Sequence, residues 1–470
     1  MELCGFTGQS LQGQGELIGA SVMGFTEHTL CPGASLYVIP KDTFLTDYLS
    51  VTFTLPLDAS TASAYALLPS VLCRGCEAYP TQDALAVRLD TLYNAGLAGR
   101  CGKSGEAQLV VFRLHCLEQD AVPPEDENEG PLFSSLIETF CDVLFHPRTE
   151  RGVFLSSYTE GEKKNLAEAI RAQSNNKAVL AMHRLEQIMF ADEVFSVPAR
   201  GTLESAAAVT PEALWQAYTD MLRHAPVSVT YVGRQMPEQV RAALSGFVSA
   251  LGRYRSAEDT FRSPQTQVIR RARQPVREVC EHMDVRQSRL CIGYRSAAVL
   301  ADRDFYKFAL FCELLGGSAS SLLFLEVRER MGLCYDCSAF PDGQKGTMFI
   351  TCGISADRLE AAREAIRAQI DVIRHGKVPP EVLEAARKSL ISAYREIEDS
   401  AAALGAWYEN RRAAGIETSP EQTVEQVLGV TARDLARCAD ALTEDTVYFL
   451  CGTGTDMDLE EDEDDAFCCD

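Results

Sequence analysis

The two halves of the chain end in the same way. The segment Val209-Thr-Pro-Glu-Ala-Leu214 precedes a β-type run that ends at Gly233, and Val430-Thr-Ala-Arg-Asp-Leu435 precedes a second such run that ends at Gly452. The two pairs of landmarks are 221 and 219 residues apart. Similarity at a fixed spacing indicates a repeated unit. We therefore expect two homologous domains of about 220 residues each.

Both halves mix strand and helix patterns. Asp47–Leu57 and Gln108–Leu117 alternate as half-buried strands do, whereas Pro131–Leu144 has helical spacing. Thr210 is expected to cap a helix that has Pro211 at its first position. In the second half we expect strands near 277–285, 289–295, 335–340, 347–353 and 447–451, and helices near 302–315, 320–330 and 356–440.

The domain boundaries are expected where these patterns stop. The basic, proline-containing stretch 253–275 lacks a clean period and is typical of a linker. Residues 456–470 carry nine carboxylates and no Lys or Arg, and such a segment cannot offset the entropy of ordering. We expect a first domain at 1–252, a second at 276–455 and a disordered acidic tail at 456–470.

The charge and the hydropathy pattern exclude several classes of partner. Asp and Glu outnumber Lys and Arg by 67 to 44, so the net charge of −23 repels phosphate backbones and anionic lipids. The sequence contains no run of 18 consecutive apolar residues, which a membrane span would need. The first residues lack the basic and apolar regions of a signal peptide. We expect a cytoplasmic protein whose 17 cysteines are small buried hydrophobes, without a disulfide framework.

The histidines restrict the metal chemistry. No two of the seven lie within five residues of each other, so neither HExxH nor HxxEH is present. Two CxxC pairs, Cys73/Cys76 and Cys334/Cys337, leave a zinc knuckle or a redox dithiol open. Accidental spacing is the favoured interpretation, because the pairs lie in opposite halves and neither begins a thioredoxin-like helix.

The run GGSASSLLFLEVRERMGLCY, from Gly316 to Tyr335, is the most informative motif. It closely resembles the second-domain signature of the M16 (pitrilysin/insulinase-type) zinc peptidases. The resemblance implies an α+β fold class: two M16-type (LuxS/metallohydrolase-like) domains, each an antiparallel-rich sheet packed with helices, together forming half of a clamshell. It also implies that Arg328 and Tyr335 bind substrate.

The first half resembles the family in the residues that follow its metal motif, but the motif itself is degenerate. Val71 to Cys76 and then Tyr79-Pro80 match the run that follows HxxEH in the family, which aligns the motif with Ala66-Leu-Leu-Pro69-Ser70. Aligning the family's downstream glutamate helix on Glu168 places the third ligand position at Gly161, between Glu160 and Glu162. Both histidines and the water-activating glutamate are therefore missing, and no metal or other cofactor is expected.

M16 enzymes that are built from two chains suggest a role for this protein. Several M16 enzymes consist of a zinc-bearing chain and an inactive sister that supplies the Arg/Tyr pair, and this chain resembles the sister. We expect a pseudo-peptidase that pairs with an active zinc-dependent M16 homologue or with itself, and that binds a peptide or protein substrate. Glu162–Phe190 resembles inactive M16-like proteins of Gram-positive bacteria that are associated with aminopentanol modification of elongation factor P.

Three alternatives remain open. The chain could be a structural scaffold, as M16-like core subunits of respiratory complexes are, or an independent thiol or metal protein that uses its CxxC pairs. It could also be a residual peptidase with unorthodox ligands. For the motif residues themselves, the competing interpretation is that Arg328 pairs with Glu326 or Asp336 at the surface and that Tyr335 is a half-buried strand residue.

Overall fold

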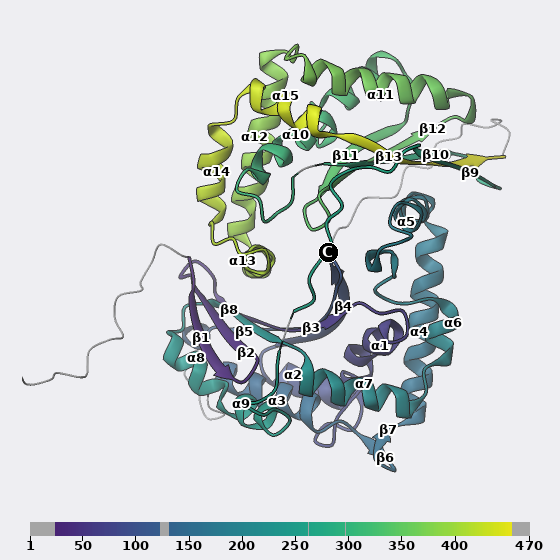
Figure 1. The fold of residues 1–470 in the computed structure, drawn as a ribbon. Helices are drawn as coiled ribbons and strands as arrows, with labels where there is room; N and C mark the ends of the chain where they lie inside the picture. The colour runs from purple at the N-terminus through teal and green to yellow at the C-terminus, as the bar shows by residue number, and fades with distance from the viewer. Residues whose placement is uncertain (1–23, 123–130, 262, 297, 454–470) are drawn as a thin grey trace, which may run out of the picture.

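The computed structural model describes residues 24–122, 131–261, 263–296 and 298–453. The predicted acidic tail at 456–470 and the amino-terminal segment considered for a signal peptide lie outside these ranges. The described residues form two β-sheets, each covered by helices on its outer side, with the other faces turned toward each other (Figure 1). Below, the N-terminal half is residues 24–252 and the C-terminal half is residues 276–453.

The N-terminal half is built on a six-stranded sheet of order β1-β2-β8-β3-β5-β4. Only the β2–β8 pair is parallel. Its strands are β1 (Thr26–Cys31), β2 (Ala34–Pro40), β3 (Thr46–Pro56), β4 (Gly96–Ser104), β5 (Ala107–Leu117) and β8 (Val227–Gly233), and a separate ribbon pairs β6 (Thr149–Glu150) with β7 (Val153–Phe154). Its helices are α1 (Ala62–Leu72), α2 (Gln82–Thr91), α3 (Leu132–Phe145), α4 (Ser156–Asn175), α5 (Lys177–Met189), α6 (Leu203–Ala208), α7 (Pro211–His224), α8 (Pro237–Ala243) and α9 (Ser245–Gly252), with short 3-10 turns at Gln119–Ala121 and Val194–Ser196.

The C-terminal half has a five-stranded sheet of order β11-β12-β10-β13-β9, in which only β13–β9 is parallel. Its strands are β9 (Arg277–Met283), β10 (Ser288–Arg295), β11 (Asp336–Asp342), β12 (Thr347–Ile354) and β13 (Thr443–Gly452). Its helices are α10 (Phe305–Gly316), the π-helical segment η4 (Leu323–Arg330), α11 (Leu359–Arg374), α12 (Pro380–Glu396), α13 (Ala401–Ala413), α14 (Pro420–Leu428) and α15 (Ala432–Ala441), with 3-10 turns at Ala356–Arg358 and Ile397–Asp399.

The two sheets share one topology. Without β1, the first sheet runs β2-β8-β3-β5-β4, and the second runs β9-β13-β10-β12-β11 with the same chain order and the same single parallel pair. The last strand of each sheet follows a helix capped by threonine: Thr210 accepts a hydrogen bond from Ala213 N, and Thr431 accepts one from Asp434 N. The predicted cap at Thr210 with Pro211 at the first helical position is confirmed. The similar endings seen in the sequence therefore belong to equivalent elements.

Each half also covers the inner face of the other half's sheet with one helix. Helix α5 of the N-terminal half packs on β10, β12 and β13, where Leu185 and Met189 join a cluster with Phe349 and Tyr448. Helix α13 of the C-terminal half packs on β3 and β8 through Leu404 and other side chains. Both helices lie between the two sheets in Figure 1. The inner face of each sheet is therefore partly buried by a helix from the other half of the chain.

Several expectations need correction. The helix expected at 320–330 is a π-helix over Leu323–Arg330, and β11 begins at Asp336, so Tyr335 precedes the strand. Cys337 and Cys352 form a disulfide between β11 and β12, so the interpretation of the cysteines as small buried hydrophobes without a disulfide framework is wrong for this pair. These two residues face each other directly across the strands, a relationship that spacing along the chain does not reveal. No helix of the described part of the chain is long and apolar enough to cross a membrane.

Candidate functional site

The structure places the three positions of the degenerate motif on α1. Ala66 is half-buried, Pro69 is buried and Ser70 is exposed. Pro69 packs so closely against Gly99 of β4 that a Cβ built on Gly99 would lie 2.6 Å from that of Pro69. The helix continues for only three residues beyond Pro69, so the proline lies in the last turn, close to a helix end as its chemistry favours.

The fourth position, Gly161, lies on α4, which packs against α1. Arg74, just beyond the end of α1, reaches across to α4. Its Nε lies 2.7 Å from Oε1 of Glu162, and a Cβ added at Gly161 would lie 3.1 Å from its Nη1. A guanidinium therefore lies beside the position where the family places a metal ligand. Sequence analysis missed this role of Arg74, because its partner is 88 residues away and no local pattern links the two.

The neighbouring carboxylates already have partners. Glu162 is buried and also accepts a hydrogen bond from Asn165 Nδ2 at 3.1 Å, and Glu160 pairs with Lys163 at 2.9 Å. Within the described ranges, no group of three or more His, Cys, Asp or Glu side chains is placed to hold a metal ion. The zinc ion of the family does not fit these residues, because Ala66, Pro69 and Gly161 have no side-chain donor and Arg74 brings a positive charge.

Arg328 lies near the carboxyl end of η4 with 41% of its side chain exposed. Its guanidinium stacks over the ring of Phe324 at 4.5 Å, and its Nε lies 3.6 Å from Oε1 of the adjacent Glu329. The surface pairing proposed with Glu326 or Asp336 is not present: Glu326 pairs with Arg330, and Asp336 pairs with Arg289. The guanidinium of Arg328 is therefore positioned by Phe324, while the side chain as a whole stays partly exposed.

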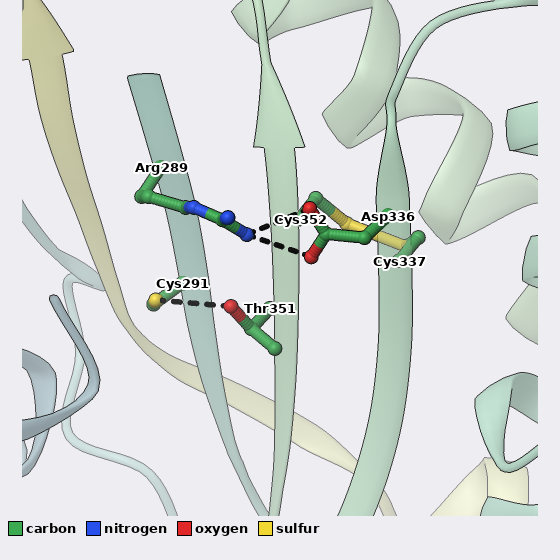
Figure 2. Close-up of a disulfide and its surroundings, with 6 residues drawn as sticks. All are labelled: Arg289, Cys291, Asp336, Cys337, Thr351 and Cys352. Carbon is green, nitrogen blue, oxygen red and sulfur yellow. Dashed lines mark hydrogen bonds and ion pairs between the residues drawn. A yellow bond between two sulfur atoms is a disulfide. The ribbon is translucent and has the colours of Figure 1, made fainter. Parts of the chain in front are cut away.

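Tyr335 is 56% exposed, which contradicts the half-buried alternative. Its backbone is nevertheless fixed, because its N–H donates to Gly353 O at 2.9 Å. The next residue, Asp336, accepts two hydrogen bonds of 2.7 Å from Arg289, and the Cys337–Cys352 disulfide follows (Figure 2). Tyr335 thus extends from a well-anchored strand start.

The cysteine pairs do not form the thiol site left open by their spacing. Burial raises the pKa of Cys73 to about 12 and that of Cys334 to about 11, and burial also raises the pKa of Cys76. Thiols in such surroundings are mostly protonated at neutral pH and react slowly. Cys337 pairs with Cys352, not with Cys334 (Figure 2). Neither CxxC pair therefore has the features of a redox dithiol.

Comparisons with known proteins show which family the chain resembles. A family model described as the peptidase M16 inactive domain matches residues 208–390. The probable inactive metalloprotease YmfF of Bacillus subtilis is 26% identical over 423 residues, which cover 90% of this chain and 96% of YmfF. The chain is therefore similar to M16-family proteins over nearly its whole length. The resemblance seen in the Gly316–Tyr335 motif is confirmed, and both matches support a pseudo-peptidase that lacks catalytic activity.

Solved structures agree with the M16 fold. A conserved protein from Enterococcus faecalis V583 superposes with a TM-score of 0.83 at 23% identity, covering 93% of this chain and all of the other. An M16 inactive domain from Pseudomonas fluorescens gives a TM-score of 0.72 at 17% identity with the same coverage. The predicted α+β fold of two M16-type sheets with helices is confirmed.

Proposed function

We propose that this chain is a non-catalytic M16 subunit that pairs with a zinc-bearing homologue and presents Arg328 and Tyr335 to that partner's active site. The observation that carries the proposal is the accessibility of these two groups. No described side chain bonds to the Tyr335 hydroxyl. Within the same part of the chain, the only ion pair of Arg328 is the long contact with Glu329. Polar groups held this way are available to a ligand.

The surroundings of the pair favour contact with another molecule. Leu325 and Met331 are 37% and 43% exposed, and both belong to the segment that carries Arg328 and ends at Tyr335. Exposed apolar side chains around polar groups are typical of interaction surfaces. We take this segment as part of the surface that faces the partner's chamber, with the two halves of this chain forming half of the clamshell.

The chemistry of each residue follows from its donor groups. The Arg328 guanidinium can hold a carbonyl or carboxylate of the substrate through two parallel hydrogen bonds. The Tyr335 hydroxyl can donate to the oxygen that becomes negative when a peptide carbonyl is attacked. The metal and the attacking water belong to the partner, since the positions on α1 and α4 have no ligands for them.

Two finer parts of the proposal rest on the sequence alone. The assignment to modification or processing of elongation factor P in the cytoplasm depends on the resemblance of Glu162–Phe190. The domain limits 1–252 and 276–455, with 253–275 as linker, depend on the pattern of the sequence. A pure scaffold remains the competing function, and it would need the surface of the chain but neither Arg328 nor Tyr335.

The test is peptidase activity of a zinc-bearing M16 homologue from the same genome, measured with and without this chain. We expect Arg328→Ala and Tyr335→Phe each to lower kcat of the complex by about a hundredfold without weakening assembly. Arg330→Ala is the matched control, because Arg330 lies on the same segment and pairs with Glu326. Full activity of both variants would leave the scaffold function and refute the proposed role.

A further inference from the structure

A cavity of about 490 Å³ lies in the C-terminal half between helices α10, α12 and α13 and the edge strand β11. Aromatic and apolar side chains form most of its wall, among them Phe305, Tyr394 and Trp407. Two charged side chains also line it, Glu313 from α10 and Arg411 from α13. Neither Arg328 nor Tyr335 takes part. The volume is in the range of small-molecule sites.

Arg411 is a buried cation that has no ion partner among the described residues. It is 9% exposed, and its guanidinium lies 3.6 Å from the ring centroid of Trp407. Its single hydrogen bond within the described chain runs from Nη1 to Thr418 Oγ1 at 3.2 Å. Burial lowers its pKa to about 10, which reflects the cost of holding the charge away from water. A buried charge is normally neutralised by a partner of opposite sign.

Glu313 is the complementary case in the same cavity. Its Oε1 is fully buried without a hydrogen-bond partner, and no described Lys, Arg or His forms an ion pair with it. Tyr394 lies within the electrostatic reach of both groups. Burial raises its pKa to about 12, while Arg411 lowers it and Glu313 raises it. Glu313 and Arg411 thus share one cavity without neutralising each other.

We propose that this cavity binds a small zwitterion of the amino-acid class. The carboxylate of the ligand pairs with Arg411, its ammonium pairs with Glu313, and an apolar or aromatic side chain packs against Trp407 and Phe305. Such a ligand supplies the two missing charges at once, and its side chain fills the apolar part of the cavity. The site is distinct from the proposed contact with a peptidase, because neither Arg328 nor Tyr335 lines the cavity, although Gly316 and Gly317 at the start of their motif do.

The test is titration calorimetry of the full chain with L-phenylalanine, and with the dipeptide Phe-Gly as a second source of the same two charges. N-acetyl-L-phenylalanine lacks the ammonium and L-phenylalaninamide lacks the carboxylate. We expect saturable binding of one or both zwitterions, weakened about ten- to a hundredfold for each of the two blocked compounds. Equal binding of the blocked compounds, or no heat from either zwitterion at millimolar concentration, would overturn the proposal.

Variants separate a ligand site from a structural role. Arg411→Met keeps the packing on Trp407 but removes the charge, so without ligand its melting temperature should equal or exceed that of the parent chain. With ligand, Arg411→Met and Glu313→Gln should both lose the upward shift that the parent shows, because the shift measures binding to the folded state. Arg395→Gln, an exposed arginine of α12 paired with Glu421, is the matched control and should keep it. A ligand shift that survives in both cavity variants would contradict the assignment.

Discussion

The ammonium of Lys345 lies 3.0 Å from the carboxylate of Glu106, and this ion pair joins equivalent turns of the two halves. Glu106 belongs to the β4–β5 turn and Lys345 to the β11–β12 turn, which occupy the same place in the shared topology. Lys345 is completely buried and also lies 2.7 Å from Oε2 of Glu193, whose Oε1 accepts from Arg295 at 2.7 Å. The halves therefore meet through a buried network of alternating charge.

Removing Lys345 should weaken the contact between the halves. Lys345→Met leaves Glu106 and Glu193 facing each other with one cation fewer, and breaking a buried ion pair in this way costs about 3–5 kcal/mol of unfolding free energy. Lys307→Met is the control, because Lys307 pairs with the largely exposed Asp304 and such pairs contribute less than about 1 kcal/mol. Urea unfolding of both variants measures the difference. Equal midpoints for the two variants would show that the network does not hold the halves together.

Much of the fold could be predicted from local patterns. The alternation in β3 and β5 marked these strands because each has one face in the core and one toward the inner space. The pattern near the amino terminus did not reveal β1 and β2, and β4 was missed because its three glycines leave little alternation to detect. Strands with weak patterns of this kind gain their conformation from pairing with neighbouring strands.

The contacts between distant segments were not predictable. The apolar stripe of α5, with Leu185 and Met189, indicates that one face is buried, but a stripe does not say that the covering sheet belongs to the other half. The family motif located Arg328 and Tyr335, yet their exposure, the Arg74–Glu162 pair and the cavity charges depend on residues brought together only by folding. Candidate site residues could therefore be predicted from the sequence, whereas the residues that contact each of them are seen only in the tertiary structure.

The packing of helix α5 on the sheet of the C-terminal half gives a second prediction, at Gly293. A Cβ at this position of β10 would collide with Sδ of Met189 and lie 3.7 Å from Leu185. Gly293→Ala should therefore lower stability by about 1–3 kcal/mol through overpacking. Gly246→Ala is the control: Gly246 is exposed on α9 with open space around it, so alanine should raise helix stability by about 0.5–1 kcal/mol.

A second substitution that partly restores the stability lost in Gly293→Ala would show that the loss comes from contact with helix α5. Met189→Ala alone should also destabilise the chain, because it leaves a cavity between α5 and the sheet. Combined with Gly293→Ala it should cost less than the sum of the two single changes, since the smaller side chain makes room for the new methyl group. Chemical denaturation of the three variants gives the coupling, and strict additivity would mean that α5 does not pack on β10 in solution.

The Arg74–Glu162 pair gives a third prediction, on metal binding. Introducing Ala66→His, Pro69→Glu and Ser70→His restores the family motif on α1, but Gly161 still supplies no carboxylate and Arg74 still lies beside it. We expect zinc well below one equivalent after dialysis, by atomic absorption. Adding Gly161→Glu together with Arg74→Met should increase the zinc content, because it supplies an anionic ligand and removes the competing cation. One equivalent of zinc in the triple variant would show that α4 does not limit the site.

The fourth prediction concerns acid stability and Glu444 of β13. Burial acts to raise the pKa of this carboxyl, but hydrogen bonds from Arg367 and Arg363 outweigh it and hold the pKa below its ordinary value of 4.5. The lowered pKa means that the unfolded chain binds the proton more readily, so the stabilisation is complete above about pH 4.5 and is lost as the pH falls through the folded pKa.

Glu444→Gln should therefore be less stable than the parent at pH 7, by about 1–3 kcal/mol, because Arg363 and Arg367 lose a charged acceptor. The difference should shrink steadily as the pH is lowered below 4.5, where the parent carboxyl also becomes neutral. Asp357→Asn, an exposed carboxylate whose contact is with Arg358 at 3.6 Å, is the control and should differ little from the parent at either pH. Urea midpoints measured between pH 7 and pH 3 follow both differences. A gap between Glu444→Gln and the parent that stays constant over this range would mean that the ionised carboxylate is not what the two arginines stabilise.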